Sequence, residues 1–138
     1  MAISSDETMV LVTAGRLLLG GLFIIGGIGH LFALSTIAGK MRARGVPFPM
    51  LGLIAGTAFE IVAGALLMFG LFVPLAAVGL ILFTIAGSVM MMNFWDMTGE
   101  KRVSAIDGWQ SNLGVIGGLL ILTALALGKT AYCCTFPF

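Results

Sequence analysis

Charged residues are scarce in this sequence. Seven Lys or Arg and six Asp or Glu make up 9% of its 138 residues, whereas 59% are hydrophobic. A soluble domain needs a charged surface, usually about a quarter of its residues, so an ordinary water-exposed fold is excluded. The net charge is only +1, and a membrane-flanking loop explains the one basic cluster, Lys40, Arg42 and Arg44, more simply than nucleic acid does. We expect no nucleic-acid partner.

Residues that bind metals are equally rare. The chain has one histidine, and its two cysteines, Cys133 and Cys134, are adjacent in the tail. A disulfide between neighbouring residues is strained, so we expect two free thiols. One histidine and two adjacent cysteines do not make a metal site within one chain. Because the sequence also lacks a nucleophile elbow, a phosphate loop and a carboxylate pair, it predicts neither metal ligands nor catalytic residues.

What the sequence does have is four long apolar runs, at about residues 9–36, 50–72, 74–95 and 109–128. A helix that crosses a hydrocarbon core of about 30 Å needs about 20 such residues. The first eight residues include Asp6 and Glu7 and lack the positive region of a signal peptide, so we expect the first run to be retained. The sequence therefore predicts an all-α membrane protein, a single domain over 1–138 with four transmembrane helices in an up-down bundle.

The basic residues indicate an orientation. The two loops at residues 39–49 and 96–108 contain Lys40, Arg42, Arg44, Lys101 and Arg102. The other side of the membrane has only Lys129. The positive-inside rule then puts both loops in the cytoplasm and both chain ends outside. Trp95 and Trp109 flank the second loop, as interfacial tryptophans do.

Glycine is abundant, with 20 residues, and most of them lie inside the apolar runs. Helix backbones approach each other closely in lipid where small residues meet. We therefore interpret these glycines first as packing surfaces.

Two ionisable residues interrupt the apolar runs, Arg16 in the first and Glu60 in the second. A charge at the centre of a membrane helix costs about 2.5 to 3.5 kcal/mol on insertion scales. Counted from the outer helix ends, the two residues differ in depth by roughly 6 Å, which an arginine side chain can span. We predict an intramembrane Arg16–Glu60 pair, acting either as a structural lock or as the lining of a cavity that holds a headgroup or relays protons.

His30 shares a helix face with Arg16 and is expected at the cytoplasmic interface. The same level should hold Asn93, Trp95 and Asn112, which gives an interfacial polar cluster. This cluster is explained either by ordinary hydrogen bonding or by a headgroup site, since a lone histidine cannot supply both axial ligands of a haem. Met90, Met91 and Met92 should point three ways around their helix and fill gaps in the bundle.

Five segments in order resemble the DoxX family of small four-helix membrane proteins. They are GRLLLGGLFIIGGIGHLF (15–32), GVPFP (45–49), FEIVAGALLMFGLFVPLAA (59–77), NFWDMTGEKR (93–102) and QSNLGVIGGLLILTALALG (110–128). The resemblance implies a four-helix membrane fold and, in some members, a link to quinone-dependent respiratory or redox complexes. By position, it implies that the family-like polar residues are Arg16, Glu60, Asn93, Trp95 and Asn112.

Three functions remain open. The first is a non-catalytic accessory subunit of a respiratory or other quinone-linked redox complex in a bacterial or archaeal inner membrane, with the bilayer and a larger complex or further copies of the chain as partners. The second is a quinone-binding redox subunit, in which Arg16 bonds a quinone carbonyl and Glu60 accepts a proton. The third is a small-molecule permease, against which the lack of an inverted repeat and of broken helices argues. The sequence identifies no cofactor by itself, and a quinone or a lipid is the candidate ligand.

Overall fold

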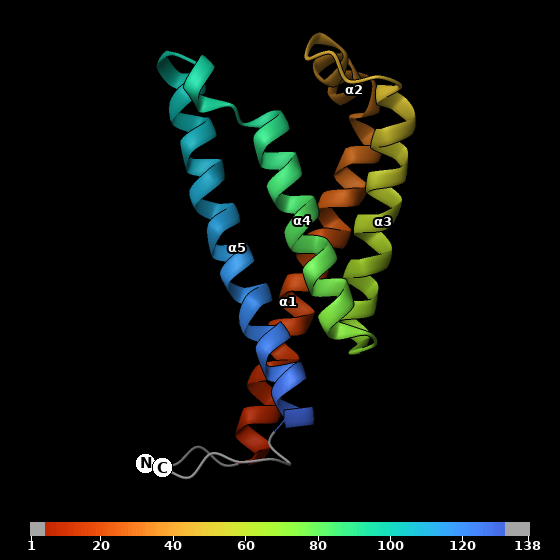
Figure 1. Cartoon of the computed structure of the whole chain (residues 1–138), viewed down its shortest axis with the longest axis vertical. Helices are drawn as coiled ribbons and strands as arrows, with labels where there is room; N and C mark the ends of the chain where they lie inside the picture. The colour runs from red at the N-terminus through yellow and green to blue at the C-terminus, as the bar shows by residue number, and fades with distance from the viewer. Residues whose placement is uncertain (1–4, 132–138) are drawn as a thin grey trace.

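The computed structural model describes residues 5–131, and within that range it consists of helices without a strand. In chain order the elements are α1 (Ser5–Phe32), α2 (Leu34–Ala43), α3 (Pro49–Phe69), α4 (Val73–Met91), the 3₁₀ helix η1 (Phe94–Asp96) and α5 (Gly99–Ala131) (Figure 1). Four of them, α1, α3, α4 and α5, are long and apolar enough to cross a membrane. The predicted all-α membrane fold with four spanning helices is confirmed.

The helices form two arms that meet at one end and diverge toward the other (Figure 1). The α1 arm contains α1, α2 and α3, and the α5 arm contains α4 and α5. Buried residues of both arms join at the narrow end, where Leu67, Ala77, Leu80 and Leu119 are fully buried. Side chains such as Leu18 point outward and remain 75% exposed, as expected of helices that face lipid.

Glycines bring α1 and α3 into backbone contact. A Cβ atom on Gly20 would lie 2.5 Å from the carbonyl oxygen of Gly64, and one on Gly64 would lie 2.9 Å from the carbonyl oxygen of Gly20. A Cβ on Gly27 would lie 2.6 Å from a side-chain carbon of Ile61. Gly21, in contrast, has open space beside it. The packing interpretation therefore holds for one face of α1 and not for all of its glycines.

Two helix boundaries differ from the expectation. The first helix ends at Phe32, and α2 is a separate helix after a turn at Ala33. The last helix begins at Gly99, so most of the expected polar loop at 96–108 is helical. Polar side chains do not by themselves end a helix, so the change in hydropathy did not locate the start of the last helix.

The turn between α3 and α4 is as short as predicted. Gly70 has φ 73°, in the left-handed region that glycine adopts without strain. The backbone N–H of Leu71 donates to the carbonyl of Leu66 at 2.9 Å and closes the end of α3. Pro74 then lies in the first turn of α4, where proline is tolerated.

Candidate functional site

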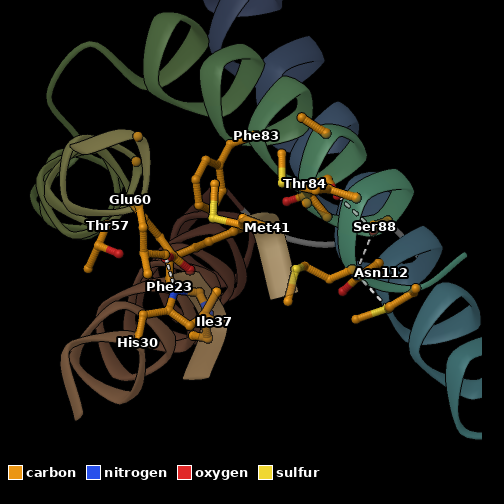
Figure 2. A pocket seen from close by; sticks show the side chains of 18 residues that line it. Phe23, His30, Ile37, Met41, Thr57, Glu60, Phe83, Thr84, Ser88 and Asn112 are labelled. Carbon is orange, nitrogen blue, oxygen red and sulfur yellow. Dashed lines mark hydrogen bonds and ion pairs between the residues drawn. The ribbon is translucent and has the colours of Figure 1, made fainter. Parts of the chain in front are cut away.

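A cavity of about 520 Å³ lies between the two arms, and all five α-helices contribute to its lining (Figure 2). We call it the membrane cavity. Most of its wall is apolar and includes Phe23, Phe83 and several methionines. The polar side chains in the wall are His30, Thr57, Glu60, Thr84, Ser88 and Asn112. They belong to two groups, one on each arm.

The first group contains Glu60, which is only 5% exposed although it lies in an apolar helix. Its Oε2 is 3.0 Å from Nδ1 of His30. The carboxylate lies against the glycine face of α1, since Cβ atoms on Gly26 and Gly27 would lie 3.2 and 3.6 Å from its oxygens. His30 follows those glycines by about one turn, and helical side chains lean toward the N-terminus, so the imidazole reaches the carboxylate.

The predicted Arg16–Glu60 ion pair is not formed. Arg16 donates a hydrogen bond to Thr13 at 3.3 Å, and its guanidinium lies directly against Gly70, at the end of α3. The C-terminus of a helix carries a partial negative charge that favours a cation there. This location explains how the arginine is accommodated.

The depth argument failed because the outer ends of the two helices are not level. Gly20 faces Gly64 in the antiparallel α1–α3 pair, so Arg16, one turn earlier, faces the end of α3. The start of α1 extends well past that end (Figure 1). Measuring both depths from the helix ends therefore placed Arg16 too close to Glu60.

One buried polar atom of the first group, the hydroxyl oxygen of Thr57, lacks a partner within residues 5–131, and two others have only each other. Oγ1 of Thr57 has no hydrogen bond among the described residues, and Thr57 is only 1% exposed. Nδ1 of His30 and Oε2 of Glu60 have no hydrogen-bond partner beyond their close approach to each other. Buried polar atoms are nearly always satisfied by protein, water or ligand. The hydroxyl of Thr57, beside the His30–Glu60 pair, is therefore available to a polar group in the cavity.

The second group forms a ladder on the α5 arm. The side-chain amide of Asn112 donates to Oγ of Ser88 at 2.8 Å, and Ser88 donates to the carbonyl of Thr84 at 2.7 Å. Thr84 in turn donates to the carbonyl of Leu80 at 2.7 Å. These bonds fix the amide of Asn112 at the wall opposite Glu60 (Figure 2).

The expected interfacial cluster is divided. Asn93 accepts a hydrogen bond from Arg44 and donates to Asp96 at 3.1 Å. Trp95 is 51% exposed and packs edge-on against Phe94. His30 instead contacts Glu60, and Asn112 contacts Ser88, because the α1 arm diverges from the α5 arm at this end. His30 and Asn112 still line one cavity, from opposite sides.

The sequence analysis did not identify Thr57, Thr84 and Ser88 as residues of the site, although their spacing along the helices could have indicated them. Thr57 precedes Glu60 by three residues, and Ser88 follows Thr84 by four, which puts each pair on one helix face. The expectation for Met90, Met91 and Met92 also needs correction, since all three line the membrane cavity. Met92 lies just past the end of α4 at Met91, so the helical angle used in the expectation does not apply to it.

Comparison with known proteins identifies the family. The profile of the DoxX family matches residues 11–93, more than half of the chain. The chain belongs to the DoxX family. It is similar to the inner membrane protein YphA of Escherichia coli (strain K12), with 29% identity over 119 residues that cover 86% of this chain and 85% of the relative. No solved structure matches it.

The DoxX match and the four apolar helices together show a small multi-pass membrane protein. The matched segment runs from α1 to just past the end of α4. It contains every polar residue of the membrane cavity except Asn112, which α5 contributes. The DoxX segment therefore carries the Glu60 wall in full, and the last helix completes the opposite wall.

Within the described residues no three His, Cys, Asp or Glu side chains are grouped as metal ligands, and the two tail cysteines lie outside those residues.

Proposed function

We propose that this DoxX protein is a small inner-membrane subunit that binds a quinone in the membrane cavity and serves a larger quinone-linked redox complex. One observation carries the proposal. The hydroxyl of Thr57, which has no partner in the described part of the chain, and the His30–Glu60 pair line one wall of a mostly apolar cavity within the membrane-spanning helices.

A quinone fits the chemistry of this wall. Its ring oxygens accept hydrogen bonds, which a hydroxyl and an imidazole N–H can donate. Its ring and isoprenoid tail are apolar, as is most of the cavity, and the phenyl groups of Phe23 and Phe83 offer ring contacts. The volume of about 520 Å³ lies within the range of about 300 to 1,000 Å³ typical of small-molecule sites.

Glu60 and His30 supply a route for protons. Reduction of a quinone to a quinol takes up two electrons and two protons. A carboxyl and an imidazole in contact can pass a proton to a ring oxygen of the bound quinone. The electrons come from a redox centre of the larger complex, so the role of this chain is to hold the quinone and exchange its protons.

Binding can be tested with a variant that fills the cavity. Gly87 lines the cavity and has open space beside it, so Gly87→Leu inserts an apolar side chain into the ligand volume. Gly114 also has open space but is exposed on α5, which makes Gly114→Leu the matched control. We expect Gly87→Leu in nanodiscs to weaken binding of a short-chain ubiquinone by about tenfold or more, and Gly114→Leu to bind as the wild type does. Equal affinities in both variants would contradict the proposal.

The proton route is tested with Glu60→Gln, which keeps the size of the side chain and removes its exchangeable charge. Quinone affinity should change little, while quinol turnover in membranes that contain the host complex should fall. Unchanged turnover means that Glu60 does not move protons.

The subunit role predicts a stable partner. After gentle solubilisation, the tagged chain should remain bound to proteins that carry flavin, haem or iron–sulfur centres. Recovery of the chain alone, under conditions that keep known respiratory complexes intact, argues against this role.

A further inference from the structure

A second cavity, of about 680 Å³, lies between α2 and the start of α5. We call it the basic cavity. Three cationic side chains line it, Lys40 and Arg44 from the end of α2 and Lys101 from α5, together with one carboxylate, Glu100. The rest of its wall includes the hydroxyl of Ser104 and several methionines and alanines. The wall thus combines a net positive charge with an apolar floor.

We propose that the basic cavity binds the headgroup phosphate of an anionic phospholipid. The inference is independent of the quinone proposal, because the polar groups of the two cavities are different.

The first argument is convergence. The positive-inside rule requires only that basic residues lie in the loops on one side of the membrane. It does not require residues more than fifty positions apart in the sequence to line the same cavity, as Lys40 and Lys101 do. Arg42 and Arg102, from the same two segments, do not line it. Basic pockets between membrane helices are a known means of holding anionic headgroups.

The second argument is that one of the cations is held in place. The guanidinium of Arg44 donates to the side chain of Asn93, and Asn93 donates to Asp96. Because the side chain is already ordered, less conformational entropy is lost when a phosphate binds.

The third argument is depth. Trp109 and Phe94 lie with their ring centroids 6.4 Å apart, and the indole N–H of Trp109 donates to the carbonyl of Met92 at 2.8 Å. Aromatic residues of this kind gather at the headgroup level of a bilayer. Met92 also lines the basic cavity, so the cavity lies where a phospholipid phosphate would be. Its apolar floor of Met91 and Met97 can take the upper part of an acyl chain.

The test compares two double variants by native mass spectrometry of the full chain after delipidation in detergent. Lys40→Gln/Lys101→Gln removes two cations from the basic cavity and leaves the Arg44–Asn93 bond intact. Arg42→Gln/Arg102→Gln removes the same charge from the same two segments outside the cavity. Phosphatidylglycerol, phosphatidylcholine and inorganic phosphate are titrated separately.

We expect the wild type and the control variant to retain phosphatidylglycerol in preference to phosphatidylcholine. The cavity variant should bind it about a hundredfold more weakly, since each charge-assisted hydrogen bond contributes on the order of tenfold. Equal losses in both variants would reduce the basic residues to a topology signal and overturn the proposal. Two results with the wild type alone would also overturn the proposal. One is equal binding of phosphatidylglycerol and phosphatidylcholine, and the other is binding of inorganic phosphate as tight as that of phosphatidylglycerol.

Discussion

Alanine in place of Gly20 is expected to separate α1 from α3. The new Cβ would lie 2.5 Å from the carbonyl oxygen of Gly64 and 3.1 Å from the backbone nitrogen of Met68. Both atoms belong to the backbone of α3, so no side-chain rotation can relieve the contact. Ordinary contact begins at 3.4 Å, and the two helices must therefore move apart by about 0.9 Å.

The size of the effect follows from two opposing terms. Overpacking of this kind costs about 1 to 3 kcal/mol. Replacing a glycine by alanine inside a helix returns about 0.5 to 1 kcal/mol. Gly21→Ala has the stabilising effect of alanine in a helix without the cost of overpacking, because nothing lies within 4 Å of its Cβ position. The free energies of unfolding of the two variants should thus differ by about 1 to 3 kcal/mol, with Gly20→Ala the less stable.

The measurement is reversible unfolding in mixed micelles, with an increasing fraction of SDS and helix content followed by circular dichroism. The two substitutions are neighbours on one helix and share the same chemistry, so general effects on detergent binding cancel. If Gly20→Ala is as stable as Gly21→Ala, the close α1–α3 contact is wrong.

Three further outcomes can be checked with the same protein. His30→Phe leaves the Glu60 carboxyl group buried without its partner and should lower the free energy of unfolding by about 1 to 3 kcal/mol. Adding Glu60→Leu should restore most of the loss, and a double variant no more stable than the single one would refute the pairing. Ser88→Ala removes the acceptor of the Asn112 amide and should cost about 0.6 kcal/mol, measured by the same SDS titration, whereas a loss of several kcal/mol would mean that the ladder does more than anchor one amide. On intact cells, a membrane-impermeant thiol reagent should label the two tail cysteines. In a variant that lacks both of them and carries Lys40→Cys, the new cysteine should react only after the cells are permeabilised. The reverse pattern would invert the predicted orientation.

The four spanning helices could be predicted because a run of about 20 apolar residues rarely occurs outside a membrane span. The helix boundaries could not all be predicted from the same signal. The segment that begins at Gly99 is polar and helical at once, so the change in hydropathy did not mark the boundary of the helix. The short turn at Gly70 was predictable because glycine and Pro74 bracket it within a few residues.

The site was predicted in part. Burial of a carboxylate in lipid requires a partner, and that reasoning correctly singled out Glu60. The identity of the partner depends on the relative shift of α1 and α3, which is set by where Gly20 and Gly64 interlock. Hydropathy does not encode that shift. A sequence argument that first matched the glycine faces would have placed His30, and not Arg16, beside the carboxylate.

The unequal lengths of the helices have a consequence for the surrounding membrane. Both α1 and α5 extend past the α3–α4 turn (Figure 1), and the span of α1, at 27 residues, is longer than that of α3, at 21 residues, by roughly 9 Å. The α3–α4 turn at its end carries Phe69, Leu71 and Phe72, all exposed and none charged. Acyl chains are expected to close over this turn, so that two helices occupy the outermost part of one leaflet while the splayed arms fill the other. Such a wedge thins the bilayer on its α3–α4 side and should concentrate the protein where the membrane is already thin or curved.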